Sequence, residues 1–223
     1  MEVMIKRKSQ LGLILAATFG MLNGCAVPGS GGLTLQSRYE KASSIAASGF
    51  LVRQDISAAP FVLAGWQRIT EPAGAPINLY IEGDGLAWLS RSTPSGNPTP
   101  KNPLGLQLAG ADPSPNVVYL ARPCQYTEID SPDNVCRQEY WTGKRYAPEV
   151  IDSYNKALDQ LTARYSSRGF HLIGYSGGAN VAGLLAERRN DILSLRTVAG
   201  NLDNDYFNRL HKVSAMPGSL NMA

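Results

Sequence analysis

The chain has 223 residues, of which 43% are apolar and 17% charged. This length and composition suit a globular domain with a sizeable core and argue against a disordered chain. The net charge of +3 arises at the N-terminus, where Lys6, Arg7 and Lys8 accompany Glu2, and the remaining residues are close to electrical balance. A near-neutral body argues against nucleic acid as a partner.

The first 24 residues have the parts of an export signal. Basic residues precede an apolar run at residues 11–22, which is too short to span a bilayer. The run ends in Leu-Asn-Gly-Cys at residues 22–25, which resembles the lipobox of bacterial lipoprotein signal peptides, although Asn23 is less typical there. An ordinary secretory signal with a coincidental cysteine is the alternative.

The lipobox resemblance implies that residues 1–24 are removed and that Cys25 becomes a lipid-modified N-terminus. Diacylglycerol on its sulfur and an acyl chain such as palmitate on its amine would give lasting membrane anchorage. Ala26, which follows the cysteine, resembles a signal for outer-membrane sorting. We therefore expect a protein of the bacterial cell envelope, anchored in the outer membrane and facing the periplasm.

The next segment begins with a Gly/Ser-rich stretch, and we interpret residues 25–48 as a lipid-anchored linker. The main domain is expected at residues 49–223. Residues 50–53 and 61–66 are rich in β-formers and predict early strands, which we expect to be antiparallel.

Two apolar runs at residues 77–82 and 116–121 predict buried strands. About thirty residues separate them, which is enough for a crossover between parallel strands. The middle of this connection, residues 92–103, is rich in Pro, Ser and Asn and predicts irregular structure.

Cys124 and Cys136 lie in one polar loop after the second of these strands. An exported protein folds in an oxidising compartment, so we expect them to form a disulfide. Two free thiols are the alternative. With Cys25 lipidated and two scattered histidines, no ligand set for a metal is visible, and no glycine-rich loop has the spacing of a nucleotide site. We expect no cofactor.

The segment from residue 148 onward predicts strand and helix in alternation. Apolar residues at helical spacing predict an amphipathic helix over residues 148–165, with Pro148 at its first turn. A strand at 170–175, a helix at about 177–189 and a strand at 193–199 follow. This alternation with continuous apolar strands indicates an α/β fold with a mostly parallel sheet covered by helices on both faces.

The most informative motif is Gly-Tyr-Ser-Gly-Gly at residues 174–178, between a predicted strand and a predicted helix. This pattern places a serine on a sharp turn with its hydroxyl exposed and a helix N-terminus beside it. Small residues around the serine suit close packing of helix on sheet. We interpret Ser176 as a nucleophile. The alternative is a glycine-rich turn that only joins a strand to a helix.

Residues 49–223 resemble the α/β-hydrolase fold, in particular bacterial lipoprotein members of that superfamily. The resemblance rests on the serine motif and on Ile-Glu-Gly-Asp-Gly-Leu-Ala-Trp at residues 81–88. It implies an oxyanion hole formed by the N–H groups of Asp84 and Gly177, with Glu82 where a histidine often stands. A plain turn is the alternative for the Gly-Asp-Gly segment.

The acid and the base are harder to assign. In this family the order is Ser, acid, His, yet only two histidines are present. His171 is five residues before Ser176 on one strand, about 16 Å away, and is interpreted as an ordinary strand residue. A compact triad of Ser176, Asp203 and His211 is conceivable. The interpretation that fits better is a truncated domain, incomplete at its C-terminus, which lacks the last strands and, with them, the base and the acid.

These patterns lead to two hypotheses. The first is a membrane-anchored serine hydrolase, esterase- or lipase-like, that cleaves a carboxylic ester or related acyl bond of a small molecule through an acyl-enzyme on Ser176. The second is a non-catalytic or decayed hydrolase-fold lipoprotein without its catalytic histidine. Five aromatic residues could line a pocket or serve in packing: Trp88, Tyr126, Tyr140, Trp141 and Tyr146.

Overall fold

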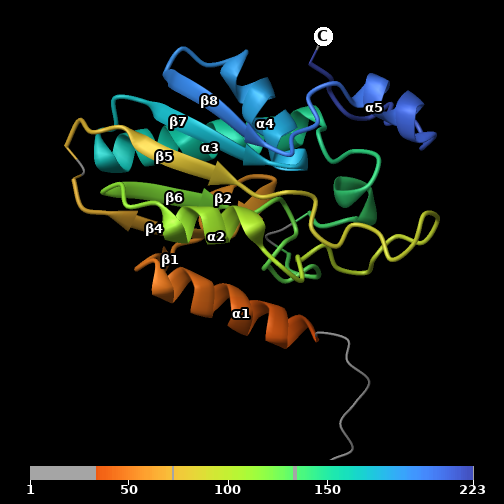
Figure 1. Ribbon diagram of the computed structural model, residues 1–223, viewed down its shortest axis with the longest axis horizontal. Helices are drawn as coiled ribbons and strands as arrows, with labels where there is room; N and C mark the ends of the chain where they lie inside the picture. Colours follow the sequence, from red (N-terminus) through yellow and green to blue (C-terminus); the bar gives the residue numbers. More distant parts are fainter. Residues whose placement is uncertain (1–33, 72, 133–134, 223) are drawn as a thin grey trace, which may run out of the picture. The chain divides into compact units, whose positions relative to one another are not determined.

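The computed structural model describes residues 34–71, 73–132 and 135–222. The expected signal peptide, Cys25 and the first part of the expected linker lie outside the described residues. The elements follow one another along the chain in Figure 1. They are α1 (Leu35–Ser48), β1 (Val52–Arg53), β2 (Ile56–Ala58), β3 (Phe61–Leu63), β4 (Gly65–Ile69), β5 (Ile77–Ile81), α2 (Leu104–Ala111), β6 (Asn116–Leu120), η1 (Gln138–Trp141), α3 (Pro148–Tyr165), β7 (Phe170–Tyr175), α4 (Gly177–Ala186), β8 (Ile192–Val198) and α5 (Asn204–His211).

The central sheet has six strands in the order β1-β4-β6-β5-β7-β8. The four strands β6, β5, β7 and β8 run parallel, while β4 pairs antiparallel with both β1 and β6. The mostly parallel sheet is therefore confirmed, as are the early antiparallel strands. The expected single strand at residues 61–66 is divided, because β3 pairs with β2 in a separate two-stranded sheet.

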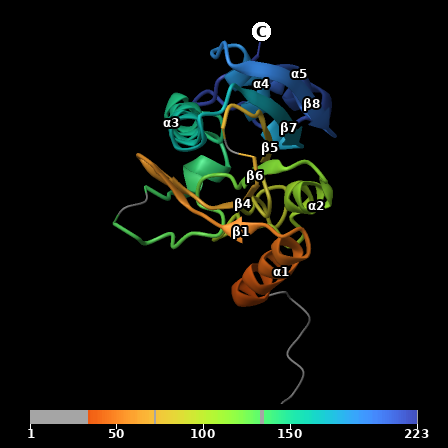
Figure 2. The same cartoon turned by 90° about the vertical axis from the view of Figure 1, so that its left-hand side faces the viewer.

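Helices cover both faces of the sheet, as predicted. Side chains of β6 alternate between two cores, since Val118 and Leu120 pack with α3 and α4, whereas Val117 and Tyr119 pack with α1 and α2. Figure 2 shows the strands between α3 on one side and α2 on the other. This alternation is what a parallel sheet buried on both faces requires.

The expected linker at residues 25–48 is corrected by α1, which occupies residues 35–48. Thr34 caps this helix, accepting a hydrogen bond from the Ser37 N–H at 3.1 Å. Ala42 and Ala46 are buried in the core that α1 shares with α2. The backbones come close where a Cβ on Gly49 would lie 2.4 Å from the Gly110 Cα. The helix was missed because the segment begins with Gly/Ser-rich residues and because the buried face of α1 consists of small residues, which give only a weak apolar pattern.

The C-terminal part of the described chain follows the prediction up to β8. The predicted helix at 177–189 ends at Ala186, and β8 lies at the edge of the sheet. The segment after α5 returns to the residues just before α3, where the Leu220 N–H donates to the Tyr146 carbonyl at 2.9 Å. None of the helices in the described part of the chain is long and apolar enough to cross a membrane.

Candidate active site

Ser176 occupies a strained turn between β7 and α4. Its backbone has φ 50° and ψ −121°, a conformation that is uncommon for a residue with a side chain. Two hydrogen bonds hold the turn: the Ser176 N–H donates to the Val198 carbonyl at 2.9 Å, and the Ala179 N–H donates to the Ser176 carbonyl at 3.0 Å. This is the strand–turn–helix geometry of a nucleophile elbow.

Glycines on both sides of Ser176 permit this close turn. A Cβ on Gly174 would lie 2.4 Å from the Ala179 Cα, and a Cβ on Gly178 would lie 2.3 Å from the Ile81 carbonyl oxygen. Both distances are far below van der Waals contact and involve backbone atoms, so neither position accepts a side chain without movement of the backbone. The close packing inferred from the small residues is therefore present.

The loop after β5 lies directly beside the serine. A Cβ on Gly83 would be 3.1 Å from the Ser176 Cβ, and a Cβ on Gly177 would be 2.1 Å from Asp84 Oδ1. The backbone N–H groups of Asp84 and Gly177 donate no hydrogen bond to any other residue that the structure describes. Two backbone N–H groups that point to no described partner, next to a strained serine, can stabilise negative charge on a carbonyl oxygen by hydrogen bonding.

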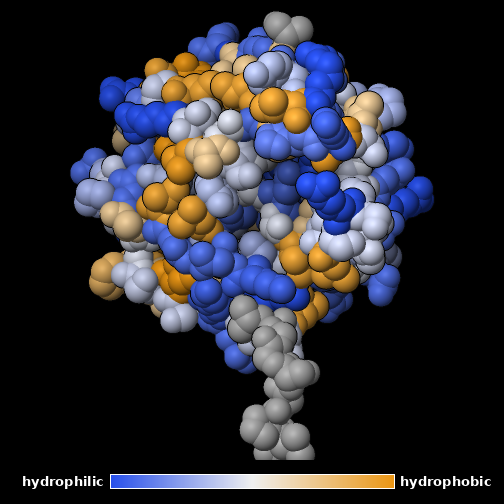
Figure 3. Space-filling model, turned by 45° about the vertical axis from the view of Figure 1, so that its right-hand side comes forward, coloured by the Kyte–Doolittle hydropathy of each residue, from blue (hydrophilic) through white to orange (hydrophobic). Residues whose placement is uncertain are grey.

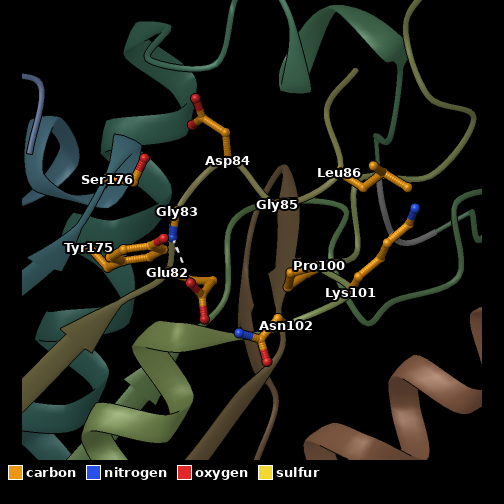
Figure 4. Close-up of a pocket in the computed structure, with 10 residues that line it drawn as sticks. All are labelled: Glu82, Gly83, Asp84, Gly85, Leu86, Pro100, Lys101, Asn102, Tyr175 and Ser176. Carbon is orange, nitrogen blue, oxygen red and sulfur yellow. Dashed lines mark hydrogen bonds between the residues drawn. The ribbon is translucent and has the colours of Figure 1, made fainter. Parts of the chain in front are cut away.

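Glu82 links the loop after β5 to the helix α2. Its carboxylate is buried and accepts four hydrogen bonds, from the N–H groups of Gly83, Gly105 and Leu106 and from the Tyr119 hydroxyl. Burial raises the pKa of Glu82, and these hydrogen bonds act in the opposite direction. Figure 4 shows the side chain turned toward α2, away from the Ser176 hydroxyl. Glu82 thus joins the loop to the N-terminus of α2, where a negative charge is favoured.

Two arginines hold the Asp84 side chain. Arg122 Nη1 lies 3.0 Å from Oδ1, and Arg145 Nη1 lies 3.2 Å from Oδ2. Both guanidinium groups also lie over the Tyr146 ring, at 5.1 and 5.5 Å from its centroid. Burial and the Asp84 carboxylate raise the pKa of Tyr146 to about 12, so its hydroxyl stays protonated at neutral pH.

A cavity of about 280 Å³ opens in front of Ser176. Its walls come from the loop after β5, from the end of β7 and from residues 100–102 (Figure 4). No histidine is among the described residues that line it. The residues are Glu82, Gly83, Asp84, Gly85, Leu86, Pro100, Lys101, Asn102, Tyr175 and Ser176.

Neither histidine lines the cavity in front of Ser176. The His171 ring lies 2.8 Å from the Ser194 hydroxyl on the neighbouring strand, in agreement with its interpretation as a strand residue. Asp203 caps α5 at its N-terminus by accepting from the Tyr206 N–H, while His211 ends the same helix and stacks on Phe207. Eight residues of helix put them about 12 Å apart along the axis, so the structure does not bring the compact triad together.

The five aromatic residues divide between packing and surface. Tyr126, Trp141 and Tyr146 are buried, and Tyr140 packs edge-on against Phe61. Trp88 is the exposed member, 41% accessible. Most of these residues therefore serve in packing.

The predicted disulfide is present between Cys124 and Cys136, with a Cα–Cα distance of 5.5 Å. It closes the loop that follows β6 and that contains Gln125. The Gln125 side chain donates to the Gly83 carbonyl at 3.0 Å, so this loop contacts the one beside Ser176. Within the described ranges no group of three or more His, Cys, Asp or Glu side chains could hold a metal ion.

Sequence reasoning identified the serine and its glycines but missed the groups that hold the loop. Arg122 and Arg145 reach Asp84 across 38 and 61 residues of chain, and no local pattern signals such pairs. For Glu82 a signal existed, since a lone acidic residue at the end of a buried strand requires hydrogen-bond partners.

Comparison with known proteins gives no match to a family model and none to a curated protein. Among solved structures, the chain is similar to a membrane phospholipase A described as a bacterial virulence factor, with 17% identity and a TM-score of 0.47, covering 81% of this chain and 51% of that one. A candidate α/β-hydrolase of unknown function from Agrobacterium tumefaciens has 17% identity and a TM-score of 0.48, covering 67% and 61%. A candidate lipase from Acinetobacter baumannii has 13% identity and a TM-score of 0.48, covering 79% and 50%.

The chain thus spans half to about three-fifths of the length of these structures. The likenesses are too distant to carry an argument about activity. The sheet order, the helices on both faces and the strained serine between β7 and α4 are features of this chain itself. On these features, the chain has the α/β-hydrolase fold.

Proposed function

We propose that the chain is a serine hydrolase, esterase- or lipase-like, that cleaves a carboxylic ester or related acyl bond through an acyl-enzyme on Ser176. The observation that carries the proposal is the backbone of Ser176, with φ 50° and ψ −121° at the end of a buried parallel strand. Such strain is retained where the surrounding structure needs the hydroxyl in one position.

In this reaction the Ser176 Oγ attacks the carbonyl carbon of the ester, and the carbonyl oxygen gains negative charge. The N–H groups of Gly177 and Asp84 stabilise that oxygen, each contributing about 2.7–4 kcal/mol by analogy with other oxyanion holes. The alcohol then leaves and water releases the acyl group from the serine. A base must take the proton of the hydroxyl, and we assign no described residue to that role.

A second candidate function is a non-catalytic or decayed hydrolase-fold protein. The absence of a histidine among the described residues that line the Ser176 cavity favours it. A serine without a base is a weak nucleophile, and an oxyanion hole alone leaves a small remnant of activity.

A fluorophosphonate probe distinguishes the two. We expect the probe to attach covalently to Ser176 in the native chain, because the N–H pair stabilises phosphonylation as it does acylation. Mass spectrometry of the digest locates the label. Ser176→Ala should abolish it, whereas Ser92→Ala, a change in the exposed loop after β5, should leave it intact. If the native chain reacts no faster than the heat-denatured chain, the scaffold function is supported and the hydrolase proposal fails.

We also propose that lipid on Cys25 anchors the chain in the bacterial envelope, at the outer membrane facing the periplasm. The support comes from the signal-like residues 1–25 and from the Cys124–Cys136 disulfide, which suits an oxidising compartment. The substrate would then be a small-molecule ester or acyl compound reached at a membrane surface.

A further inference from the structure

A second and larger cavity lies near the Ser176 cavity. Its volume is about 640 Å³, which is within the range of small-molecule sites. Four segments form it: the loop at 88–91 after β5, the turn at 142–145 after η1, the helix α5 and residues 212–216. None of these segments contains a residue of the proposed acyl-transfer machinery.

Large apolar side chains stand in the walls of this second cavity and remain exposed. Trp88 and Leu89 come from a small hairpin in which the Leu89 N–H donates to the Thr93 carbonyl at 2.8 Å. Phe207 and Val213 come from α5 and the residues after it. Figure 3 brings this side of the molecule forward and shows hydrophobic patches beside hydrophilic side chains around a hollow. Exposed apolar groups gathered in one concave place are typical of a binding site.

The charged side chains of the second cavity are all basic. Arg91, Arg145 and Lys212 line it, and among the described lining residues there is no aspartate or glutamate. The Nε of Arg145 is buried without a hydrogen-bond partner in the described part of the chain. A cavity lined by apolar side chains and by several cations favours a ligand that combines an apolar chain with an anionic group.

One ion pair connects this second cavity to the Ser176 cavity. Asp84 lines the cavity of Ser176, and Arg145 lines the second cavity, while their side chains are 3.2 Å apart. The two cavities are therefore neighbours, separated by this ion pair, so a ligand held in the second cavity would lie close to the residues that line the Ser176 cavity.

We propose that the second cavity binds the anionic, amphiphilic portion of the substrate, whose apolar chain lies against Trp88 and Leu89 and whose phosphate or carboxylate group is near Arg91 and Lys212. The inference rests on the proposed function and names its substrate class, an acyl ester that also carries an anionic group. Charge complementarity selects this occupant over a neutral or a cationic amphiphile.

Binding can be measured without turnover in the full chain with Ser176→Ala. Dodecyl phosphate, titrated below its critical micelle concentration by isothermal calorimetry, is expected to bind at least about tenfold more tightly than dodecyl maltoside or dodecyl trimethylammonium at low salt. Added salt should reduce the difference, because it screens the exposed charges. Dodecanoate tests whether a carboxylate replaces the phosphate.

Two pairs of variants locate the site. Lys212→Gln should weaken dodecyl phosphate binding by up to about fivefold, which is the range of one exposed ion pair. Arg168→Gln is the control and should not weaken it, because this exposed arginine precedes β7, at the opposite end of the strand from Ser176. Leu89→Ser should flatten the dependence of affinity on alkyl chain length. The matched change Leu35→Ser, at an exposed leucine of α1, should not.

Equal affinity for the anionic and neutral amphiphiles, or equal effects of Lys212→Gln and Arg168→Gln, would overturn the inference. Self-association that Leu89→Ser abolishes, seen by sedimentation, would make this face an interface between copies and would also overturn it. Fluorophosphonate labelling of the wild-type chain distinguishes failure of the hydrolase proposal from failure of the second cavity as a substrate site. Binding without labelling refutes the hydrolase proposal and leaves the second cavity as a binding site for an anionic amphiphile. Labelling without selective binding refutes the second cavity and leaves the hydrolase proposal standing.

Discussion

Gly174 shows how much a single missing side chain determines near the nucleophile. It lies two residues before Ser176, where a Cβ would be 2.4 Å from the Ala179 Cα and 2.6 Å from the Ala179 nitrogen. Both neighbours are backbone atoms of α4, so a methyl group can be accommodated only if strand and helix move apart. The position of the helix N-terminus relative to Ser176 therefore depends on this glycine.

We predict that Gly174→Ala lowers the free energy of unfolding by about 1–3 kcal/mol, the usual cost of forcing extra atoms into a packed interior. Urea denaturation followed by circular dichroism measures the change. Gly96→Ala is the matched control, because a Cβ there would meet nothing within 4 Å. Equal midpoints for the two variants would contradict the packing argument.

At this scale the sequence predicts the residues whose role is local. Ser176, Gly177 and Gly178 stand within one turn, so the turn geometry constrains their identities and can be inferred from their spacing. The partners of Asp84 could not be predicted in the same way. Arg122 follows β6 and Arg145 follows η1, and only the folded chain brings them together.

Among elements, the connection between β5 and α2 depends on the buried carboxylate of Glu82. We predict that Glu82→Gln lowers the free energy of unfolding by about 1.5–3 kcal/mol. Both carboxylate oxygens of Glu82 accept hydrogen bonds from backbone N–H groups, and the amide NH₂ of glutamine cannot accept the bonds that one of these oxygens accepts. Thermal or urea unfolding tests this. Glu71→Gln, at an exposed glutamate after β4, is the control. A loss no larger than that of the control would show that Glu82 does not hold α2.

The elements that the sequence predicted well are those with a strong periodic pattern. The bounds of α3 and β7 agree with the predictions at 148–165 and 170–175. The helices α1, α2 and α5 were not predicted. The eight residues of α2 include two glycines, and its N-terminus is stabilised by Glu82, which is distant in sequence. Such helices form because tertiary contacts support them, and intrinsic propensity does not reveal them.

At the scale of the whole molecule, the proposed attachment to a membrane depends on Cys25 in the N-terminal segment. We predict that cells fed an alkyne fatty acid label the wild-type chain and not Cys25→Ser, because the thiol of Cys25 is the expected site of lipid attachment. Click chemistry and gel fluorescence detect the label. Equal labelling of both chains would end the lipoprotein interpretation. Membrane fractionation provides a second readout, in which Cys25→Ser moves to the soluble fraction.

One hydrogen bond gives the edge of the sheet an influence on the nucleophile. The Ser176 N–H donates to the Val198 carbonyl of β8, and β8 has a neighbour on one side only within the described sheet. Edge strands open locally at a lower free energy than central ones. Each such opening would remove one of the two hydrogen bonds that hold the Ser176 turn. We therefore expect the Ser176 amide and the amides of β8 to exchange hydrogen at similar rates, which hydrogen-exchange mass spectrometry would measure.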